Sequence, residues 1–395
     1  MLKRTECGAE LNVMGGDGTV YFADIRRIKD ALAAKYGGSA RVVYIDPPFG
    51  TGGSFEFRRG KKQTAYTDSL PRDEYLALIR EAVRLSYELL KDDGTFFLHI
   101  DYRMSAAARL ICDEVFGEDG LTNEIIWAYK SGGRAKNAFS KKHDTILMYR
   151  RSQDAYFDLK AVGVPRGPER RNHMRRAVDE TGRVYYSIRT NGKEYRYYED
   201  DPVYPSDVWD DIEHLHQRDP ERTGFITQKP EALLKRIILS CSREGDTVID
   251  LFGGSGTTAV TAAKLNRKFV SVDCGRAATA VTRKRLIERC LKMRLYDAPM
   301  PLAVETDDKA DIGECRMPDE YFDISESDGC LVLSMKKLAL EASPFYAAVG
   351  TIKDGVFTAS DYLLRVKAGE KLTLRPGESL ELVDEDLAQG FFVNE

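Results

Sequence analysis

Short β-branched and aromatic runs alternate with helical periodicity along most of this chain of 395 residues, and no other feature limits its fold as strongly. Before residue 150 the pattern predicts strands over residues 19–22, 41–45, 95–100 and 145–149 and helices over residues 25–35, 73–91 and 106–116. From residue 228 it predicts a helix over 230–242, a strand over 247–250, a helix ending at 265 and a strand over 268–273. This alternation is typical of an α/β fold, in which helices cover both faces of a mostly parallel sheet.

The alternation fails in two regions. Between residues 151 and 205 the apolar periodicity gives way to Gly, Pro, Arg and Tyr, which indicates an insertion into the α/β domain. After residue 300, short strand-like runs predict a small, mainly β appendage, and residues 372–382 resemble an alternating hairpin. We therefore expect four segments: the two parts of the α/β domain at 1–151 and 205–300, the insertion at 152–204, and an acidic C-terminal appendage of unknown role at 301–395.

Charge is distributed very unevenly along the chain, although the formal net charge is only −4. Residues 130–196 contain 17 Lys and Arg against 7 Asp and Glu, a balance of +10, while residues 301–395 contain 9 against 20, a balance of −11. Basic residues interleaved with aromatic ones suit phosphate neutralisation and base stacking, although such a run can also be a plain solvated face. The expected DNA contacts are Lys130, Arg134, Lys136, Lys141, Lys142, Arg166, Arg170, Arg171, Arg175 and Arg176.

Composition excludes several other classes of protein. No apolar run approaches the roughly 20 residues that span a bilayer, and no signal-like hydrophobic block follows the first residues, so we expect a cytoplasmic protein without membrane contact. The seven cysteines are scattered without a Cys-x-x-Cys pair, and the chain has only five histidines. We therefore expect free thiols and no metal site.

A glycine turn follows the strand predicted at 247–250 and opens a helix. It comprises Asp250, Phe252, Gly253, Gly254, Ser255, Gly256, Thr257 and Thr258. Glycines allow close approach of a ligand, and the helix N-terminus offers unpaired N–H groups. The turn lacks the lysine of a P-loop and fits the dinucleotide fingerprint poorly, but Asp273 ends the next strand, where a carboxylate can bind ribose hydroxyls. The combination favours an adenosine-containing ligand over a turn that only packs a helix on a sheet.

Asp46, Pro47, Pro48 and Phe49 stand at the carboxyl end of the strand predicted at 41–45. The two prolines fix two backbone dihedrals and remove two donors, which leaves the local carbonyls available as acceptors. A carboxylate and a rigid carbonyl can accept the two hydrogens of an exocyclic amine, and the phenylalanine ring can stack on a planar base. Such a segment can also simply end a strand, but open α/β sheets bind ligands at the carboxyl ends of their strands. The segment therefore predicts a pocket for the amino group of adenine or cytosine.

These motifs resemble those of the beta-class, circularly permuted DNA amino-methyltransferases. Residues 46–49 are similar to the Asp-Pro-Pro-Tyr/Phe signature of that family, and residues 250–258 to its S-adenosylmethionine motif, with 204 residues between the two aspartates. Segments 139–144, 208–212 and 227–230 are similar to modification subunits of type III restriction systems and to stand-alone adenine methyltransferases. The match spans about residues 19–289, and 152–204 coincides with the target-recognition region of the family. Gly50, Gly253 and Gly254 depart from the usual residues, and Phe49 lacks the tyrosine hydroxyl, which stacking does not need.

The resemblance implies a Rossmann-like, S-adenosylmethionine-dependent methyltransferase that acts on N6 of a flipped-out adenine in double-stranded DNA. Asp46 and Pro47 would accept the amino hydrogens, next to Pro48, while Phe49 would stack on the base. The glycine turn and Asp250 would lie near the methionine moiety of the cofactor. The resemblance also implies Asp273 at the ribose, Asp24 near the cofactor adenine, and Thr227, Gln228 and Lys229 at the amino-acid end. A homodimer and a restriction-subunit partner both remain open.

Several alternatives remain. An N4-cytosine methyltransferase would use the same pocket, although an Asp at the first signature position goes with adenine in most members of the family. Cytosine C5 methylation is excluded because it needs a thiolate that typically follows a proline, and no cysteine here does. An oxidoreductase would leave residues 46–49 without a role, a non-catalytic specificity subunit would show decayed motifs, and an RNA substrate remains open. The methyltransferase hypothesis requires the strand ends at residues 45 and 250 to meet at one crevice.

Overall fold

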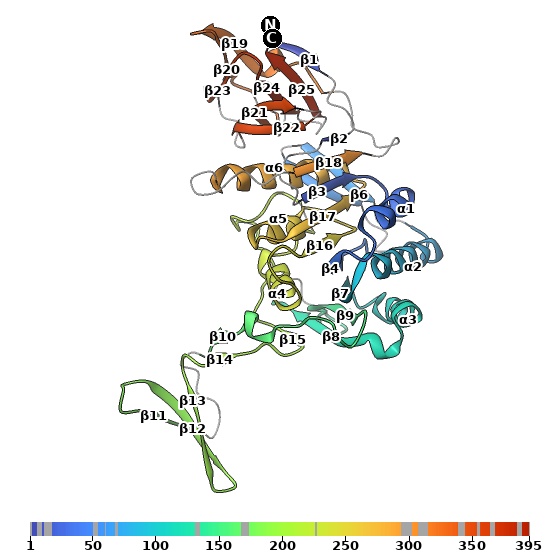
Figure 1. Cartoon of the computed structure of the whole chain (residues 1–395), viewed down its shortest axis with the longest axis vertical. Coiled ribbons are helices and arrows are strands. Elements are labelled where there is room, and N and C mark those ends of the chain that lie inside the picture. Colours follow the sequence, from blue (N-terminus) through green and yellow to red (C-terminus); the bar gives the residue numbers. More distant parts are fainter. Residues whose placement is uncertain are drawn as a thin grey trace.

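The computed structural model describes most of the chain, namely residues 2–5, 10–11, 18–49, 54–59, 61–67, 70–130, 135–166, 174–225, 227–293, 302–306, 315–338, 344–353, 356–363, 368–384 and 389–394. Its centre is a ten-stranded sheet in the order β15-β8-β9-β7-β4-β16-β17-β3-β18-β2 (Figure 1). These strands are β2 (Glu10–Leu11), β3 (Gly18–Phe22), β4 (Ala40–Ile45), β7 (Leu90–Ile100), β8 (Leu121–Ala128), β9 (His143–Arg150), β15 (Val208–Trp209), β16 (Thr247–Asp250), β17 (Lys268–Asp273) and β18 (Leu302–Thr306).

The middle of this sheet is parallel. β7, β4, β16, β17, β3 and β18 pair with one another in parallel, whereas β9 is antiparallel to both β7 and β8. The predicted mostly parallel α/β sheet is therefore confirmed. Because β4 and β16 are parallel neighbours, their carboxyl ends lie side by side at one edge of the sheet.

Six helices cover the two faces of the sheet, as predicted (Figure 1). One face carries α1 (Ile25–Tyr36), α2 (Arg72–Leu89) and α3 (Ser105–Phe116), and the other carries α4 (Glu231–Cys241), α5 (Thr257–Lys264) and α6 (Arg276–Met293). In β4 the side chains alternate between two hydrophobic cores, with Val42 and Tyr44 in one and Val43 and Ile45 in the other. This is why the strand is apolar throughout.

Two details of the α/β region differ from the sequence prediction. α2 ends at Leu89, and β7 begins at once at Leu90 instead of residue 95, so Gly94 lies inside the strand. β8 was not predicted, because its first half is polar and only Ile125 and Trp127 are buried. The strand forms because it pairs with β9 over most of its length.

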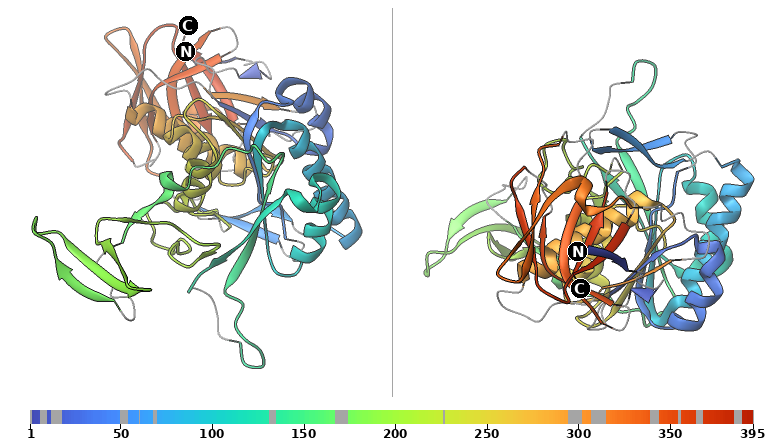
Figure 2. Two further views of the ribbon diagram at one scale, coloured as in Figure 1. Left: turned by 60° about the horizontal axis from the view of Figure 1, so that its bottom comes forward. Right: turned by 90° about the horizontal axis from the view of Figure 1, so that it is seen from above.

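The predicted insertion contains a projecting arm (Figures 1 and 2). Its neck is the antiparallel pair β10 (Val164–Pro165) and β14 (Pro202–Val203), and its blade is the antiparallel sheet of β11 (Arg175–Val178), β12 (Val184–Thr190) and β13 (Lys193–Tyr198). Asn191 and Gly192, both with positive φ, make the turn between β12 and β13. No residue of the arm belongs to a hydrophobic core of the described chain. The arm is thus a separate unit carried on two adjacent strands.

The C-terminal part is mainly β, as predicted. A five-stranded sheet has the order β1-β25-β24-β21-β22, and a three-stranded sheet has the order β19-β20-β23. Their elements are β1 (Leu2–Thr5), α7 (Pro318–Tyr321), β19 (Phe322–Ser327), β20 (Cys330–Met335), β21 (Tyr346–Lys353), β22 (Val356–Leu363), β23 (Lys371–Leu374), β24 (Ser379–Val383) and β25 (Gln389–Asn394). A buried ion pair between Arg283 of α6 and Glu381 of β24 joins this part to the α/β region.

The predicted hairpin at 372–382 is wrong. β23 pairs with β20 of one sheet, whereas β24 pairs with β21 and β25 of the other, so the chain crosses between two sheets at this turn. Alternation identified both strands but not their partners, which are distant in sequence. Likewise β18, beyond residue 300, pairs with β3 of the central sheet, and β1 at the N-terminus pairs with β25.

Three smaller segments complete the described structure: a hairpin of β5 (Ser54–Arg59) and β6 (Lys61–Thr67), and the 3-10 turns η1 (Glu118–Gly120) and η2 (Leu159–Val162). Within the described residues no helix is long and apolar enough to cross a membrane. The cysteines whose side chains are described, namely Cys112, Cys241, Cys274, Cys315 and Cys330, are free thiols.

Candidate active site

The carboxyl ends of β4 and β16 open into a cavity of about 330 Å³. Tyr44 and Asp250 are paired across the two strands, so the segments that follow them enter the same space. The two sequence motifs therefore meet at one crevice, although they lie far apart in the chain. Of the residues predicted for catalysis and cofactor binding, all but Gln228 and Gly256 line this cavity. Its size lies within the range of small-molecule sites.

Asp250 is fixed at the end of β16 by two hydrogen bonds. The backbone N–H of Phe252 donates to Oδ1 at 2.9 Å, and the hydroxyl of Thr258 donates to Oδ2 at 2.5 Å. Burial raises the pKa of Asp250 to about 7, although both hydrogen bonds oppose the shift. This carboxyl group is therefore able to hold or release a proton near neutral pH, depending on the charge of what enters the cavity.

Asp273 fixes the glycine turn against the next strand. The backbone N–H groups of Gly254 and Gly275 donate to its two carboxylate oxygens at 2.8 and 2.7 Å. Gly254 has a φ of +51°, a conformation that disfavours side chains. A Cβ atom on Gly253 would lie 2.2 Å from the hydroxyl oxygen of Ser271, so these glycines let the turn pack closely on β17. Burial raises the pKa of Asp273 as well.

Asp24 caps the N-terminus of α1 at the rim of the cavity. It accepts the backbone N–H of Arg26 at 2.9 Å and pairs with the guanidinium group of the same residue. Burial alone would raise the pKa of Asp24, but the hydrogen bonds from Arg26 lower it. The cavity is therefore walled by four carboxyl groups, those of Asp24, Asp46, Asp250 and Asp273. The pKa of Asp24 is lowered, whereas burial raises the pKa of Asp250 and of Asp273.

Asp46 is paired with Lys229, a contact that sequence reasoning did not foresee. The ammonium group of Lys229 donates to Oδ2 of Asp46 and lies 5.2 Å from the centre of the Phe49 ring. Oδ1 of Asp46 is buried and accepts no hydrogen bond within the described residues. A cationic nitrogen thus occupies the position between carboxylate and ring that the sequence assigns to an amino group.

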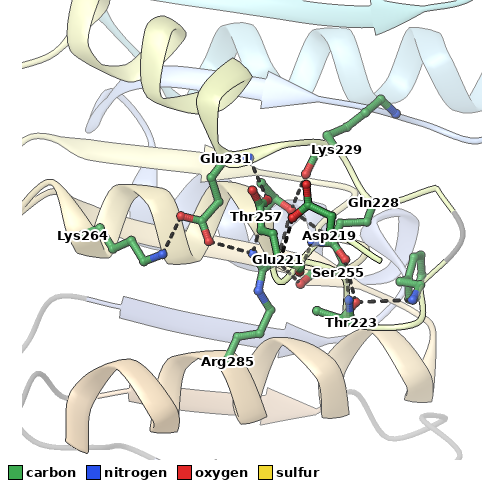
Figure 3. A network of polar contacts seen from close by, with 11 residues as sticks. Asp219, Glu221, Thr223, Gln228, Lys229, Glu231, Ser255, Thr257, Lys264 and Arg285 are labelled. Atoms are coloured by element: carbon green, nitrogen blue, oxygen red, sulfur yellow. Dashed lines mark hydrogen bonds and ion pairs between the residues drawn. The ribbon is translucent and has the colours of Figure 1, made fainter. Parts of the chain in front are cut away.

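The segment that carries Lys229 is fastened by polar contacts (Figure 3). Gln228 accepts from the backbone N–H and hydroxyl of Thr223 at 2.9 and 2.8 Å, and donates to the carbonyl of Glu221 at 2.7 Å. The prediction of Gln228 as a cavity residue is therefore not supported, because its side-chain amide forms hydrogen bonds within the loop. Gly256, the other predicted residue outside the lining, has a φ of +73° and is the N-cap that precedes α5.

The same network links this loop to α5 and α6. The hydroxyl of Thr257 donates to the carbonyl of Lys229 at 3.1 Å, and Arg285 donates to the carbonyl of Ser255 at 2.8 Å and to Glu231 at 3.0 Å. In Figure 3 the Lys229 side chain points away from these contacts. The backbone of residue 229 is therefore held in place by this network, while its side chain pairs with Asp46.

Aromatic rings form a wall behind Phe49. His99 stacks on Phe49 at 6.1 Å between ring centres and is fully buried. Its two nitrogens contact the Tyr44 hydroxyl at 2.9 Å and Asp144 Oδ2 at 3.2 Å. Burial opposes ionisation of Asp144, but the hydrogen bond from His99 lowers its pKa to about 2. These contacts fix the orientation of the His99 ring behind Phe49.

The predicted DNA contacts are spread over the surface. Lys130 pairs with Glu213, Lys141 donates to the hydroxyl of Tyr102 at 2.7 Å, and Lys142 donates to the carbonyl of Lys130 at 3.4 Å. Lys136 is exposed in the loop between β8 and β9, and Arg166, Arg175 and Arg176 belong to the arm. Arg134, Arg170 and Arg171 lie outside the described residues.

The lining suits S-adenosylmethionine by the chemistry of its groups. Carboxyl groups of Asp250, Asp273 and Asp24 can accept from ammonium and hydroxyl groups, while Phe252 and Leu78 offer apolar surface. Sequence reasoning missed Leu78 and Leu70, whose place at the cavity depends on how α2 packs. Among the described residues, no three His, Cys, Asp or Glu side chains gather to hold a metal ion.

The family model for DNA methylases that act at N6 or N4 matches residues 40–284, and the chain belongs to this family of S-adenosylmethionine-dependent enzymes. It is 28% identical over 295 residues to the type II methyltransferase M.EcaI of Enterobacter cloacae, covering 63% of this chain and 65% of that one. It thus spans less than two thirds of the length of M.EcaI. It is also 28% identical over 237 residues to the DNA adenine methyltransferase YhdJ of Escherichia coli K12, covering 60% and 72%.

The resemblance to DNA amino-methyltransferases is therefore confirmed, and modification subunits of type III systems are among the relatives of the chain. Among solved structures, a DNA modification methylase of Thermus thermophilus, TTHA0409, complexed with S-adenosyl-L-methionine, matches with a TM-score of 0.44 and 17% identity, covering 74% of this chain and 99% of that one.

Proposed function

We propose that this protein is a site-specific DNA methyltransferase that transfers the methyl group of S-adenosylmethionine to N6 of an adenine flipped out of the duplex. The observation that carries the proposal is the Asp46 carboxylate, one oxygen of which is buried without a hydrogen-bond donor among the described residues, beside the Phe49 ring. A buried, unsatisfied acceptor is costly, and an amino group entering the cavity would supply the missing donor.

The chain's own residues position the target amine. S-adenosylmethionine supplies an electrophilic methyl group on a sulfonium. Asp46 and the carbonyl of Pro47 accept the two amino hydrogens, which draws the nitrogen lone pair out of conjugation and directs it toward the cofactor side of the cavity. Phe49 stacks on the base, and His99 supports that ring from behind at 6.1 Å. The rate gain comes from placement and fixed electrostatics, without a covalent intermediate.

Lys229 has to leave Asp46 before the target base can bind. Its ammonium group pairs with Oδ2 of Asp46, next to the free Oδ1, and lies over the ring on which the base would stack. The carboxylate of the methionine moiety is the anion that could attract Lys229 away, since residues 227–229 are expected at the amino-acid end of the cofactor. Binding of S-adenosylmethionine would then open the site for the base.

A paired adenine cannot reach this cavity without leaving the duplex, which costs a few kcal/mol. The basic residues of 130–196 are proposed to hold the phosphates, and the arm, as target-recognition region, to read the sequence. In the arm, guanidinium groups lie over tyrosine rings, as with Arg183 over Tyr198 at 4.0 Å. Such pairs present cationic and aromatic surface together.

Adenine is favoured over cytosine by Asp46 at the first signature position and by the relation to YhdJ, an adenine methyltransferase. N4-cytosine methylation is the alternative, because the carboxylate and carbonyl would accept that amino group equally well. A role in a restriction–modification system follows the relatives named above. A restriction subunit and a second copy of the chain are proposed partners, and the cytoplasm is the proposed location.

The test is to sequence modified bases in DNA from cells that express the wild type or Asp46→Ala. We expect N6-methyladenine at one short motif with the wild type only, because losing one preorganised group costs about 100- to 1,000-fold in rate. Asp119→Ala, an exposed carboxylate outside the cavity, is the control. Equal methylation by the wild type and Asp46→Ala would refute the role of Asp46, and N4-methylcytosine would establish the alternative.

A further inference from the structure

The loop between β8 and β9 carries the most exposed of the large apolar side chains that the structure describes. Phe139 is 99% exposed, compared with 66% for Leu110, the next most exposed. A fully exposed phenylalanine gains nothing from burial in the folded protein, so its ring is available to a partner. Figure 2 shows the described part of this loop, residues 135–142, projecting from the body of the molecule.

The loop lies at the same edge of the sheet as the cavity. β9 is antiparallel to β7, with Thr145 opposite Ile100, so the start of β9 adjoins the carboxyl end of β7. β7 is in turn the parallel neighbour of β4, which ends at the signature segment. Phe139 therefore projects from the edge at which Asp46 receives its base.

A continuous row of rings connects Phe49 with the base of the loop. Phe49 stacks on His99 at 6.1 Å, His99 meets Trp127 at 5.5 Å, and Trp127 meets Tyr129 at 5.4 Å. Tyr129 begins the loop, and its backbone N–H donates to the carbonyl of Lys142 at 2.9 Å. The base of the loop is thus held at a fixed position relative to the proposed base pocket.

The loop is anchored and positively charged. The backbone N–H of Ala135 donates to the hydroxyl of Ser140 at 3.0 Å, and Lys141 donates to Tyr102 at 2.7 Å while lying 4.1 Å from the centre of its ring. Residues 135–142 include Lys136, Lys141 and Lys142 and no acidic residue. This charge is complementary to a polyanion, so the partner that fits the loop is duplex DNA.

We infer that Phe139 inserts into the duplex and fills the space that the target base leaves when it flips out. The inference rests on the proposed function, since only an enzyme that extrudes a base creates such a space. Apolar side chains are suited to this role because they stack on the neighbouring bases without a requirement for hydrogen bonds. Phe139 would thus be a positioning residue that favours the extrahelical state, with no contact to the reacting atoms.

The experiment compares two substrates that carry the motif found by modified-base sequencing. One has the target base correctly paired, and the other has an abasic site opposite the target, which is then already easy to extrude. For Phe139→Ala we expect kcat/KM to fall roughly tenfold or more on the paired duplex and less than about twofold on the abasic one. Phe139→Leu should recover most of the loss, and Leu110→Ala serves as the exposed apolar control.

Each outcome has a distinct meaning. Equal losses of Phe139→Ala on the two substrates would overturn the inference, because the residue would then act in binding or folding and not in extrusion. Unchanged activity on both would overturn it as well. Absence of methylation of either substrate by the wild type would instead count against the proposed function itself. A third duplex, with 2-aminopurine at the target position, gives a second readout. Its fluorescence should rise when it binds the wild type but not when it binds Phe139→Ala.

Discussion

The cavity and the arm are built in opposite ways. At the cavity, Asp250 and Asp273 are fixed by backbone N–H groups at the ends of neighbouring core strands. In the arm, the charged groups are solvated, as with Arg183 and Asp200, which pair at 2.7 Å with side chains 49% and 68% exposed. A buried carboxylate cannot be moved without disturbing two strands, whereas an exposed pair of this kind contributes little to stability.

Under the proposed function this contrast corresponds to a division between chemistry at the cavity and DNA recognition by the arm. Groups that must be placed to within a fraction of an ångström are at the sheet edge, where packing on both faces leaves them one position. The groups proposed to read the DNA sequence are on the arm, a separate unit with no residue in a hydrophobic core of the described chain. Substitutions in the arm should therefore leave the cavity unchanged. Enzymes that share one reaction but recognise different sequences require such independence.

Removing the arm should give the largest effect that tests the contrast between the cavity and the arm. The ends of the arm are adjacent, because the backbone N–H of Arg166 donates to the carbonyl of Asp201 at 3.0 Å. Replacing residues 167–200 by two glycines should therefore leave the thermal unfolding midpoint and S-adenosylmethionine binding unchanged. Discrimination between the recognition motif and other DNA should fall by about 1,000-fold or more. Competition binding with specific and random duplexes measures it.

The counterpart of this deletion is Asp46→Ala, which should bind the motif like the wild type and lose methylation. If the deletion retained full discrimination, recognition would lie in the α/β region and the proposed division would be wrong. A loss of the unfolding transition would contradict the separation of the arm from the hydrophobic cores.

Most of the site could be predicted from sequence because local patterns specify it. The apolar strand before Asp46 and the glycines after Asp250 each identify a strand that ends at a ligand edge, and parallel strands place such ends together. The pairing of β23 and β24 with different sheets was not predictable, because alternation says nothing about partners. The contact of Lys229 with Asp46 was equally inaccessible, since it joins segments 183 residues apart.

The pH dependence of the free energy of unfolding should distinguish the buried carboxyl group of the cavity from an exposed one in the arm. Burial raises the pKa of Asp250 to about 7, whereas the hydrogen bond from Arg183 lowers the pKa of the exposed Asp200. The unfolded chain releases the proton of Asp250 near pH 4, and the folded protein keeps it up to about pH 7. The free energy of unfolding should therefore fall as the pH rises through this interval, by roughly 2 kcal/mol between pH 5 and 6.5.

The measurement is denaturant unfolding of the cofactor-free wild type and Asp250→Asn at several pH values. The difference between the two should change with pH in the stated direction, because the amide does not titrate. For Asp200→Asn, the matched change in the arm, the difference in unfolding free energy from the wild type should not change with pH in this direction, because Asp250 is present in both proteins. A difference between wild type and Asp250→Asn that is independent of pH would show that Asp250 is ionised throughout.

The smallest predicted effect concerns Lys229, which is proposed to couple the cofactor site to the base site and contacts Asp46. In Lys229→Met the KM for S-adenosylmethionine should rise about tenfold, the worth of one charge-assisted hydrogen bond. Without cofactor, however, this variant should bind duplex with an abasic site opposite the target more tightly than the wild type, because Asp46 and Phe49 are no longer covered. Lys235→Met, an exposed change on α4, is the control. If cofactor affinity stayed the same and base affinity fell, Lys229 would assist Asp46 directly, and the two sites would not be coupled through its displacement.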